Sequence, residues 1–168
     1  MVTEERASGA VVLKAGEGQP IWFLSNLMVV KATAGTTNGA YGLVESLIAP
    51  GASPPMHIHH REDESFYVLD GALTVSCGGE TYDATTGSYI FLPRGVPHTF
   101  RVVSETPARL LTLITPGGGE GVFAAGGRPA ERMTLPPVAP PDIERVKQAA
   151  LQFGSEIVGP PLSAGLTR

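Results

Sequence analysis

The sequence predicts an all-β protein, a small barrel or sandwich of short strands with one helix near the C-terminus. Glycine (21 residues) and proline (15) are plentiful among the 168 residues, whereas charged residues make up only 17%. This composition favours many strands joined by tight turns over a helical bundle. Short runs of β-branched and aromatic residues recur between turn signals, which is typical of a sandwich or barrel. A stripe of apolar residues at helical spacing is convincing in one segment only.

The length predicts one domain with a sizeable core. We expect residues 1–20 to form an N-terminal arm with at most a short strand over 10–14. Residues 21–125 are predicted to form the barrel. Residues 126–168 are predicted to form a C-terminal extension whose helix, over about 142–153, packs on the outside of the barrel.

The first half of the barrel begins with a β-rich run over 21–33 and a turn at Asn38-Gly39. A strand over 41–49 follows, and it carries apolar residues on both faces, with Tyr41, Leu43 and Leu47 on one side and Val44 and Ile48 on the other. A strand that is apolar on both sides is covered on both sides. We therefore expect another surface to cover the outer face of this strand, and we expect a second subunit of a homodimer to supply it.

The central segments alternate between strands and turn signals. An extended piece over 57–59 and a charged loop over 61–63 precede two strands, 65–69 and 72–77, around Asp70-Gly71, which predicts a hairpin. Gly78-Gly79 predicts a turn before a strand over 80–84. Further strands are expected over 88–92, 98–103 and 109–115.

The C-terminal part holds a glycine-rich run and the predicted helix. No Lys-Ser or Lys-Thr pair follows the run over 116–121, which we interpret as a flexible loop rather than a phosphate cradle. Residues 126–141 are rich in proline and glycine and are expected on the surface. Asp142 suits the first turn of the helix and Gly154 its end. The apolar stripe of the helix is Ile143, Val146, Ala150 and Phe153.

Charge and hydropathy exclude several classes of protein. The net charge is −4 and no basic cluster is present, so nucleic acid is not an expected partner. The longest apolar stretch, 21–30, is too short to span a bilayer, and the charged N-terminus does not read as a secretory signal. The single cysteine, Cys77, suits a reducing compartment. We therefore expect a cytoplasmic protein in which Cys77 is a buried structural thiol.

Histidines and carboxylates gather between residues 57 and 98. His57 and His59 are two residues apart, which on a strand places both side chains on one face, roughly 6–7 Å apart. Glu64 opens the next strand after a four-residue loop, and His98 opens a later strand behind Pro97, which fixes the backbone. Three imidazoles and one carboxylate suit Fe, Mn, Ni, Cu or Zn rather than Mg or Ca. Four protein ligands would leave places open on the ion, as a catalytic site requires.

The same residues carry a resemblance to the cupin superfamily. The first cupin motif is Gly, five residues, His-x-His, three or four residues, Glu, six residues, Gly, and it is matched by Gly51, His57, His59, Glu64 and Gly71. The second is Gly, five residues, Pro-x-Gly, two residues, His, and it is matched by Gly87, Pro93, Gly95 and His98. Val102 stands where the family often has Asn, a residue that is not a metal ligand. The fifteen-residue spacer, 72–86, resembles that of small single-domain bacterial cupins.

The resemblance implies a cupin β-barrel, also called a double-stranded β-helix or jelly roll, with one divalent metal ion held by His57, His59, Glu64 and His98. Asp63 is the alternative carboxylate, but its distance to Gly71 departs from the motif. His60 is expected to point away from the site. Arg94, at the tip of a turn, is expected to be exposed rather than to anchor a substrate.

Strand alternation predicts the pocket around this ion. Phe66 and Val68 share the face of Glu64, and Phe100 shares that of His98. Together with Met56 they predict an apolar, partly aromatic pocket. Leu73, Val75 and Cys77 are expected to form another part of the interior.

The resemblance to quercetin 2,3-dioxygenase-like cupins implies a dioxygenase for a small aromatic or enolisable, flavonol-like substrate, with Glu64 as general base. The alternatives are a redox-neutral cyclase or isomerase that uses the metal as a Lewis acid and a non-enzymatic small-molecule binding protein. Whether the segment 116–127 closes over the pocket stays open.

Overall fold

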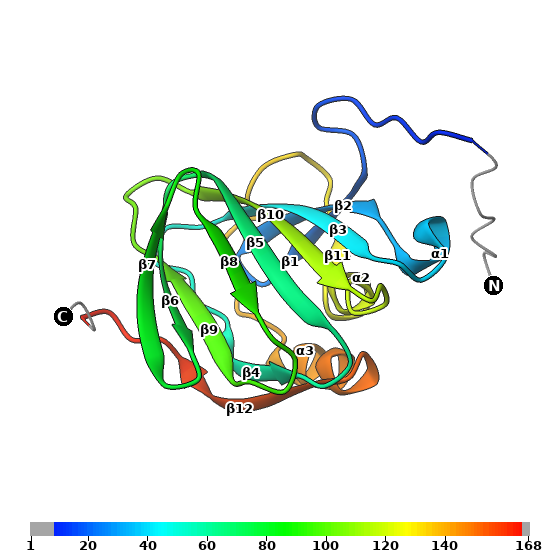
Figure 1. Ribbon diagram of the computed structural model, residues 1–168. Helices are drawn as coiled ribbons and strands as arrows, with labels where there is room; N and C mark the ends of the chain where they lie inside the picture. The colour runs from blue at the N-terminus through cyan, green and yellow to red at the C-terminus, as the bar shows by residue number, and fades with distance from the viewer. Residues whose placement is uncertain (1–8, 166–168) are drawn as a thin grey trace.

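The computed structural model describes residues 9–165, which form a barrel of two antiparallel sheets that face each other (Figure 1). The seven-stranded sheet has the order β11-β1-β2-β3-β10-β5-β8, and the five-stranded sheet has the order β12-β4-β9-β6-β7. Short helices lie outside the two sheets. The predicted all-β jelly roll with a C-terminal helix is confirmed.

The strands of the seven-stranded sheet are β1 (Gln19–Phe23), β2 (Asn26–Ala32), β3 (Gly42–Ile48), β5 (Asp63–Asp70), β8 (Tyr89–Leu92), β10 (Ala108–Thr115) and β11 (Arg128–Pro129). Those of the five-stranded sheet are β4 (Pro55–His59), β6 (Ala72–Cys77), β7 (Glu80–Thr85), β9 (His98–Val102) and β12 (Ser155–Pro161). The helices are α1 (Ala34–Thr37), α2 (Gly121–Gly126) and α3 (Ile143–Gln152).

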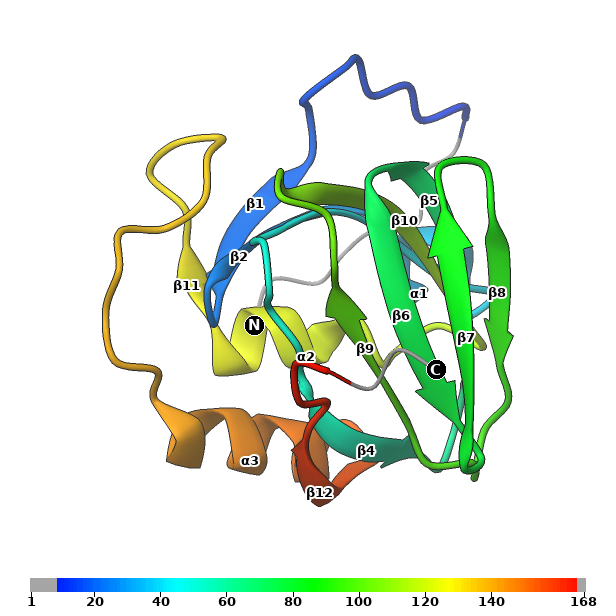
Figure 2. The ribbon, with the colours of Figure 1, turned by 90° about the vertical axis from the view of Figure 1, so that its left-hand side faces the viewer.

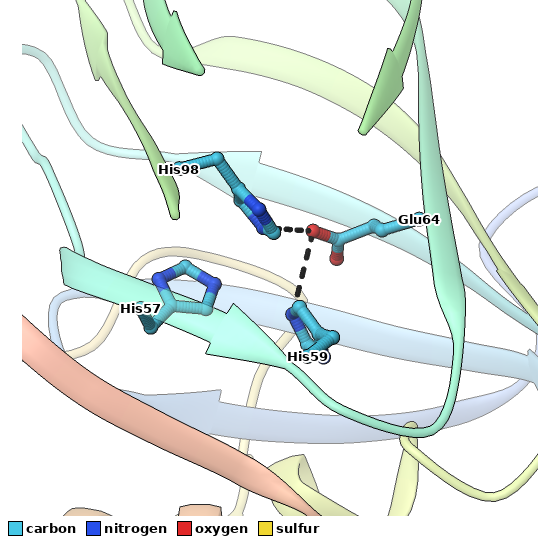
Figure 3. Close-up of side chains that lie close together, drawn as sticks. All are labelled: His57, His59, Glu64 and His98. Atoms are coloured by element: carbon cyan, nitrogen blue, oxygen red, sulfur yellow. Dashed lines mark ion pairs between the residues drawn. The ribbon is translucent and has the colours of Figure 1, made fainter. Parts of the chain in front are cut away.

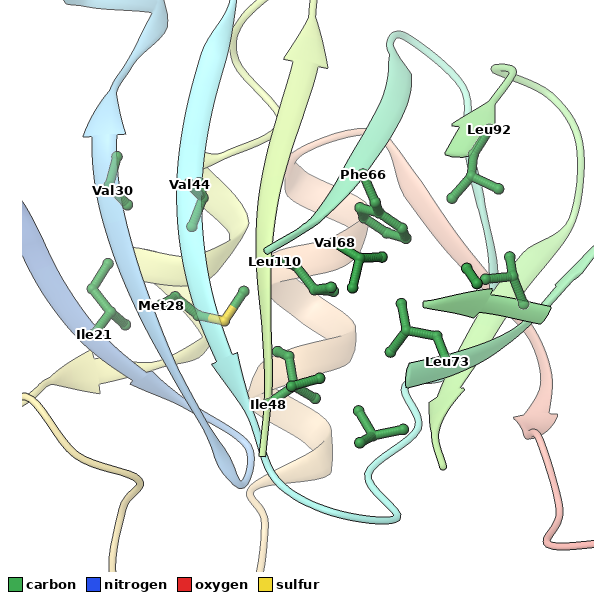
Figure 4. Close-up of a cluster of buried hydrophobic side chains, with 14 residues drawn as sticks. Ile21, Met28, Val30, Val44, Ile48, Phe66, Val68, Leu73, Leu92 and Leu110 are labelled. Atoms are coloured by element: carbon green, nitrogen blue, oxygen red, sulfur yellow. The ribbon is translucent and has the colours of Figure 1, made fainter. Parts of the chain in front are cut away.

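The core fills the space between the sheets (Figure 4). Along β3 and β10 every second residue is buried, so one face of each strand points inward. From the opposite sheet Leu73 and Val75 meet this face and are fully buried, as expected. Cys77 is half-buried against the same core, and burial raises the pKa of its thiol, which fits a structural role.

The outer face of the seven-stranded sheet carries a second cluster, built on Trp22, Leu27 and Val29, with Leu47 of β3 packed against it. The chain itself covers this cluster. The indole nitrogen of Trp22 donates a hydrogen bond to the carbonyl oxygen of Thr134 at 2.8 Å. The C-terminal extension therefore covers part of this cluster, on the outer face where a second subunit was expected.

Residues 10–14 form no strand, which agrees with the expectation of at most a short one there. One local expectation in the N-terminal part is corrected, because the β-rich run 21–33 is a hairpin of β1 and β2 rather than one strand. Its two-residue turn places Leu24 at φ 55°, a left-handed conformation that is uncommon for leucine. Leu24 stands at the first position of this turn, where a glycine or asparagine would have signalled the hairpin in the sequence.

The expected hairpin at Asp70-Gly71 is also wrong. β5 pairs with β10 and β8, whereas β6 pairs with β7 and β9, so the turn carries the chain from one sheet to the other. Gly71 has φ 93°, and a Cβ there would lie 2.9 Å from the backbone of Ala108. The signal marks a tight turn correctly but does not specify which strands pair. Gly78-Gly79, in contrast, does join the paired strands β6 and β7.

The C-terminal segment closes one end of the barrel (Figure 2). Helix α3 begins behind Asp142, whose side chain accepts a hydrogen bond from the backbone of Arg145. Its buried residues are Val146, Ala149 and Ala150, whereas Ile143 is exposed. After Gly154 the chain forms β12, which pairs with β4 and was not expected. A short helix, α2, also follows the glycine-rich run, where none was expected. No helix among the described residues is long and apolar enough to cross a membrane.

Candidate metal centre

The side chains of His57, His59, Glu64 and His98 point toward one another and form a cluster between the two sheets (Figure 3). β4 carries His57 and His59, and its neighbour β9 places His98 directly opposite His57. Glu64 comes from β5 in the other sheet. One ligand atom from each of these four residues lies within 4.8 Å of the other three. The four residues that the sequence predicted as ligands are thus brought together.

Backbone carbonyls fix the ring orientation of two of the histidines. Nδ1 of His57 lies 2.7 Å from the carbonyl oxygen of Pro55, and Nδ1 of His98 lies 3.0 Å from that of Val96. A carbonyl can only accept, so Nδ1 must carry the proton in both rings. The lone pair of each neutral imidazole is then on Nε2, which is the form that binds a metal.

His59 is oriented by side chains instead. Its Nδ1 lies 2.7 Å from Oε1 of Glu62 and 3.1 Å from the hydroxyl of Ser155. Glu62 is 2% exposed, although the sequence placed it in a charged loop. A Cβ on Gly119 would lie 2.5 Å from Oε1 of Glu62, so this glycine of the 116–121 run makes room for the carboxylate.

Two imidazole nitrogens of the cluster have no hydrogen-bond partner in the described structure. They are Nε2 of His59 and Nε2 of His98, and both are buried. They lie 3.6 Å and 3.3 Å from Oε2 of Glu64. Buried polar atoms without a partner are costly. A divalent transition metal, for which imidazole and carboxylate are suitable ligands, would satisfy both nitrogens together with the carboxylate.

The charges of the cluster depend on one another. Burial and the neighbouring His98 lower the pKa of His57 to about 4. Burial alone would raise the pKa of Glu64, but the three imidazoles lower it to about 2. Burial alone would lower the pKa of His59. Its hydrogen bond to Glu62 and the negative charges of Glu64 and Glu62 outweigh burial and raise that pKa overall. At neutral pH the cluster therefore offers an ionised carboxylate and a neutral His57.

The neighbours of the cluster take other roles. Asp63 points to Arg94 rather than to the histidines, in a paired contact with an Nη2–Oδ2 distance of 2.9 Å. Arg94 also donates to the carbonyl of Arg61, so it holds the loop before Glu64. His60 is exposed and lies 3.0 Å from Glu156, away from the cluster.

A mostly apolar cavity of about 130 Å³ adjoins the cluster. His57, His59, Glu64, Phe66 and Phe100 line it, and the two phenylalanine rings stack edge to face at 5.5 Å. The other walls come from β1–β3, β10, α2, α3 and β12 and include Phe23, Leu24, Asn26, Met28, Ser46, Ile48, Leu110, Thr112, Val122, Phe123, Val146, Ala150, Ser155 and Ile157.

Two expected pocket residues, Met56 and Val68, do not line this cavity. Met56 lies between Pro55 and His57 on β4, and its side chain lies beside Gly159 of β12. Val68 is completely buried in the core, two residues further along β5 than Phe66. Residues of α2 and α3 line the cavity instead. No local pattern in the sequence could reveal that these two helices form part of the cavity wall.

Replacing Glu62 with glutamine is expected to weaken metal binding without unfolding the protein. The amide keeps the size of the side chain but removes the charge that holds His59, and loss of such an outer partner costs roughly 10–100-fold in metal affinity. Competition titration with a chromophoric chelator measures the change. The matched control is Glu156→Gln, which changes the exposed carboxylate beside His60. Equal affinities of the two variants would contradict the role of Glu62.

The fold and the cluster together define a double-sheet β-barrel protein with three histidines and one glutamate gathered at one end. A model of the cupin domain family matches residues 44–114, which include all four of these residues. The chain is a cupin, and it resembles quercetin 2,3-dioxygenase.

Curated relatives support this resemblance. Quercetin 2,3-dioxygenase of Bacillus subtilis (strain 168) is 30% identical over 141 residues, which are 83% of this chain and 42% of that protein. Polyketide synthase CurC of Streptomyces cyaneus is 30% identical over 89 residues, which are 53% of this chain and 56% of that protein. The chain thus spans about half the length of these relatives.

Solved structures share the fold. KdgF from Halomonas sp. superposes with a TM-score of 0.57 at 19% identity, over 65% of this chain and 94% of the other. A predicted oxalate decarboxylase from Thermotoga maritima superposes with a TM-score of 0.58 at 21% identity, over 63% and 99%. At these identities the likeness concerns the barrel alone.

Proposed function

We propose that the chain is a metal-dependent dioxygenase for a small aromatic or enolisable substrate. The observation that carries the proposal is the pair of buried, unpartnered Nε2 atoms of His59 and His98 facing Glu64 at the edge of an apolar cavity. The proposed ligands of one divalent ion are His57, His59, Glu64 and His98. The similarity to quercetin 2,3-dioxygenase of Bacillus subtilis supports the reaction class.

The bound ion would act as a Lewis acid that lowers the pKa of a substrate hydroxyl. The carboxylate of Glu64 faces the position of the proposed ion and is ionised at neutral pH, so it can accept the proton of that hydroxyl. A carboxylate with so low a pKa is a weak base, so the transfer requires a hydroxyl as acidic as a phenol or enol next to a cation. Phe66 and Phe100 line the cavity beside Glu64 and exclude water around the substrate ring.

The cavity favours the smaller members of this substrate class. Pockets for drug-sized ligands typically measure roughly 300–1,000 Å³, whereas this cavity measures about 130 Å³. A single substituted ring fits that volume better than a full flavonol. Catechols and cyclic diketones are therefore the first substrates to test, with flavonols as the comparison.

The test combines metal analysis of the protein purified from its own host with oxygen uptake on catechols, diketones and flavonols. We expect one divalent transition metal ion per chain and oxygen consumption with at least one of these substrates. Absence of oxygen uptake across the panel by fully loaded protein would rule out the dioxygenase. A ligand that binds the loaded protein and is recovered unchanged would instead indicate a binding protein.

A redox-neutral cyclisation or isomerisation is the second candidate. The 30% identity to polyketide synthase CurC of Streptomyces cyaneus favours it. The same cluster would then polarise a carbonyl group and Glu64 would move a proton between carbon and oxygen. Turnover that continues at an unchanged rate without oxygen separates this reaction from the first.

We also propose that the chain forms a homodimer. The outer face of β5 and β8 exposes Tyr67, Tyr89 and Phe91, with Tyr67 and Tyr89 directly opposite each other. Exposed aromatic groups on neighbouring strands are typical of an interaction surface. Light scattering at micromolar concentration measures the mass, and a monomer would contradict the proposal.

A further inference from the structure

A buried hydroxyl without a partner lies in the cavity wall, away from the histidines. Ser46 of β3 is 2% exposed, its Oγ makes no hydrogen bond in the described structure, and the residue lines the cavity. Besides Nε2 of His59 and Nε2 of His98, this Oγ is the only buried side-chain nitrogen or oxygen atom without a hydrogen-bond partner among the described residues. The two nitrogens are explained by a metal ion, whereas the serine is not.

The sheet register places Ser46 at a defined distance from Glu64. Glu64 pairs with Ile114 of β10, and Ser46 pairs with Leu110 of the same strand. Two strand spacings and four residues along the strand therefore separate them, which is on the order of 15 Å between Cα atoms. Thr112 of β10 lies between them on the inward face and also lines the cavity. Glu64, Thr112 and Ser46 thus form a diagonal line of polar residues across this sheet, whose other cavity-lining residues are apolar except Asn26.

The charge around Ser46 limits what it can bind. No lysine or arginine lines the cavity in the described part of the chain. A carboxylate or phosphate at this end would therefore lack a counter-ion, which makes its burial costly. A neutral carbonyl or hydroxyl group can instead form one hydrogen bond with the serine hydroxyl.

We propose that Ser46 is a specificity-determining residue, which binds a neutral oxygen at the end of the substrate remote from the histidine cluster. The inference rests on the proposed function, because the cluster must hold the other end. The substrate then carries oxygen at both ends of a flat apolar body: acidic hydroxyl groups at the cluster, and a carbonyl or hydroxyl group at Ser46. Serine at this position discriminates against analogues that lack the second oxygen, because their binding leaves the hydroxyl unpaired.

Two catechols that differ in one oxygen test the inference on the metal-loaded protein. 3,4-Dihydroxyacetophenone carries a carbonyl group opposite the catechol hydroxyls, and 4-ethylcatechol has a methylene group in its place. We expect Ser46→Ala to weaken binding of the first about tenfold, the range for a buried hydrogen bond, and to leave binding of the second unchanged. Because the carbonyl group also acidifies the catechol, the quantity compared is the ratio of the two losses, as in a double-mutant cycle.

The matched control is Ser76→Ala on β6, which removes a buried serine hydroxyl outside the cavity. It should leave both affinities unchanged. We also expect Ser46→Ala to unfold at the same urea concentration as the wild type or a higher one, since the lost hydroxyl has no partner in the free protein. A lower midpoint for Ser46→Ala would show a structural role and overturn the inference.

The outcomes separate this inference from the proposed function. Equal losses for the two catechols, or none, would overturn the role of Ser46 while leaving the cluster intact. Failure of both catechols to bind wild-type protein loaded with metal would overturn the substrate class itself, and the inference with it.

Discussion

Replacing His98 with alanine should abolish stoichiometric metal binding. His98 is 1% exposed, its Nε2 has no hydrogen-bond partner among the described residues, and its Nδ1 lies 3.0 Å from the carbonyl oxygen of Val96. Alanine removes one of the four proposed ligands and leaves two imidazoles and one carboxylate. We expect the affinity to fall by more than the roughly 10–100-fold that an outer-shell change costs. Metal content after gel filtration and chelator competition measure it.

His60→Ala is the matched control for this variant. His60 lies beside the cluster in sequence but is exposed and paired with Glu156. Its removal should leave metal content and affinity unchanged. Circular dichroism checks that both variants are folded, because His98 is also part of the buried interior. A folded His98→Ala protein that keeps wild-type metal affinity would contradict the proposed ligand set.

Only the pairing of His57 with His59 could be predicted from local geometry, whereas Glu64, in the other sheet, and His98, on a later strand, are joined to them through the resemblance to the cupin motifs. His57 and His59 share a strand face by simple alternation, and the tight turns at Gly51, Gly71, Gly87 and Gly95 fix the spacing of the remaining elements. Each of these glycines has a positive φ, which few other residues adopt. Spacing between such fixed turns carries information about three-dimensional position.

Features that depend on distant pairing could not be predicted in this way. The turn at Gly71 was correctly recognised, but only the register shows that it joins two sheets. The sequence places Glu62 in a charged loop, and its burial could not be predicted because the neighbouring Gly119 lies more than fifty residues away in the chain. β12 contains glycine and two prolines, residues that are uncommon inside strands, so its composition did not mark it as a strand. It forms because β4 offers it a free edge.

The pH dependence of the metal-free protein should show the burial of His57. Its pKa is about 4 in the folded protein, against an ordinary value of 6.5. Between these values the unfolded chain binds a proton that the folded protein does not, so stability falls as the pH falls. At 1.36 kcal/mol per pKa unit, the free energy of unfolding should drop by about 3 kcal/mol from pH 7 to pH 4.

Glu64 and His59 also affect how stability depends on pH, but Glu64 acts at lower pH than His57 and His59 acts with the opposite sign. The pKa of Glu64 is lowered, so its contribution is lost only below its ordinary value of 4.5, as the pH falls toward 2. The pKa of His59 is raised, so its contribution is complete below 6.5 and is lost as the pH rises through its folded value. Between pH 6.5 and 4.5, His57 is therefore the member of the cluster that sets the slope.

Urea unfolding in the presence of a chelator, at intervals from pH 7 to pH 4, measures this slope. The His57→Gln variant keeps a polar side chain but cannot titrate, so its stability should be nearly flat between pH 6.5 and 4.5 and fall below that range as the wild type does. Parallel curves for the two proteins would show that His57 takes up its proton normally in the folded state. A flat wild-type curve with an intact cluster would lead to the same conclusion. Either result would remove the expectation that His57 offers a neutral nitrogen to a metal ion across this pH range.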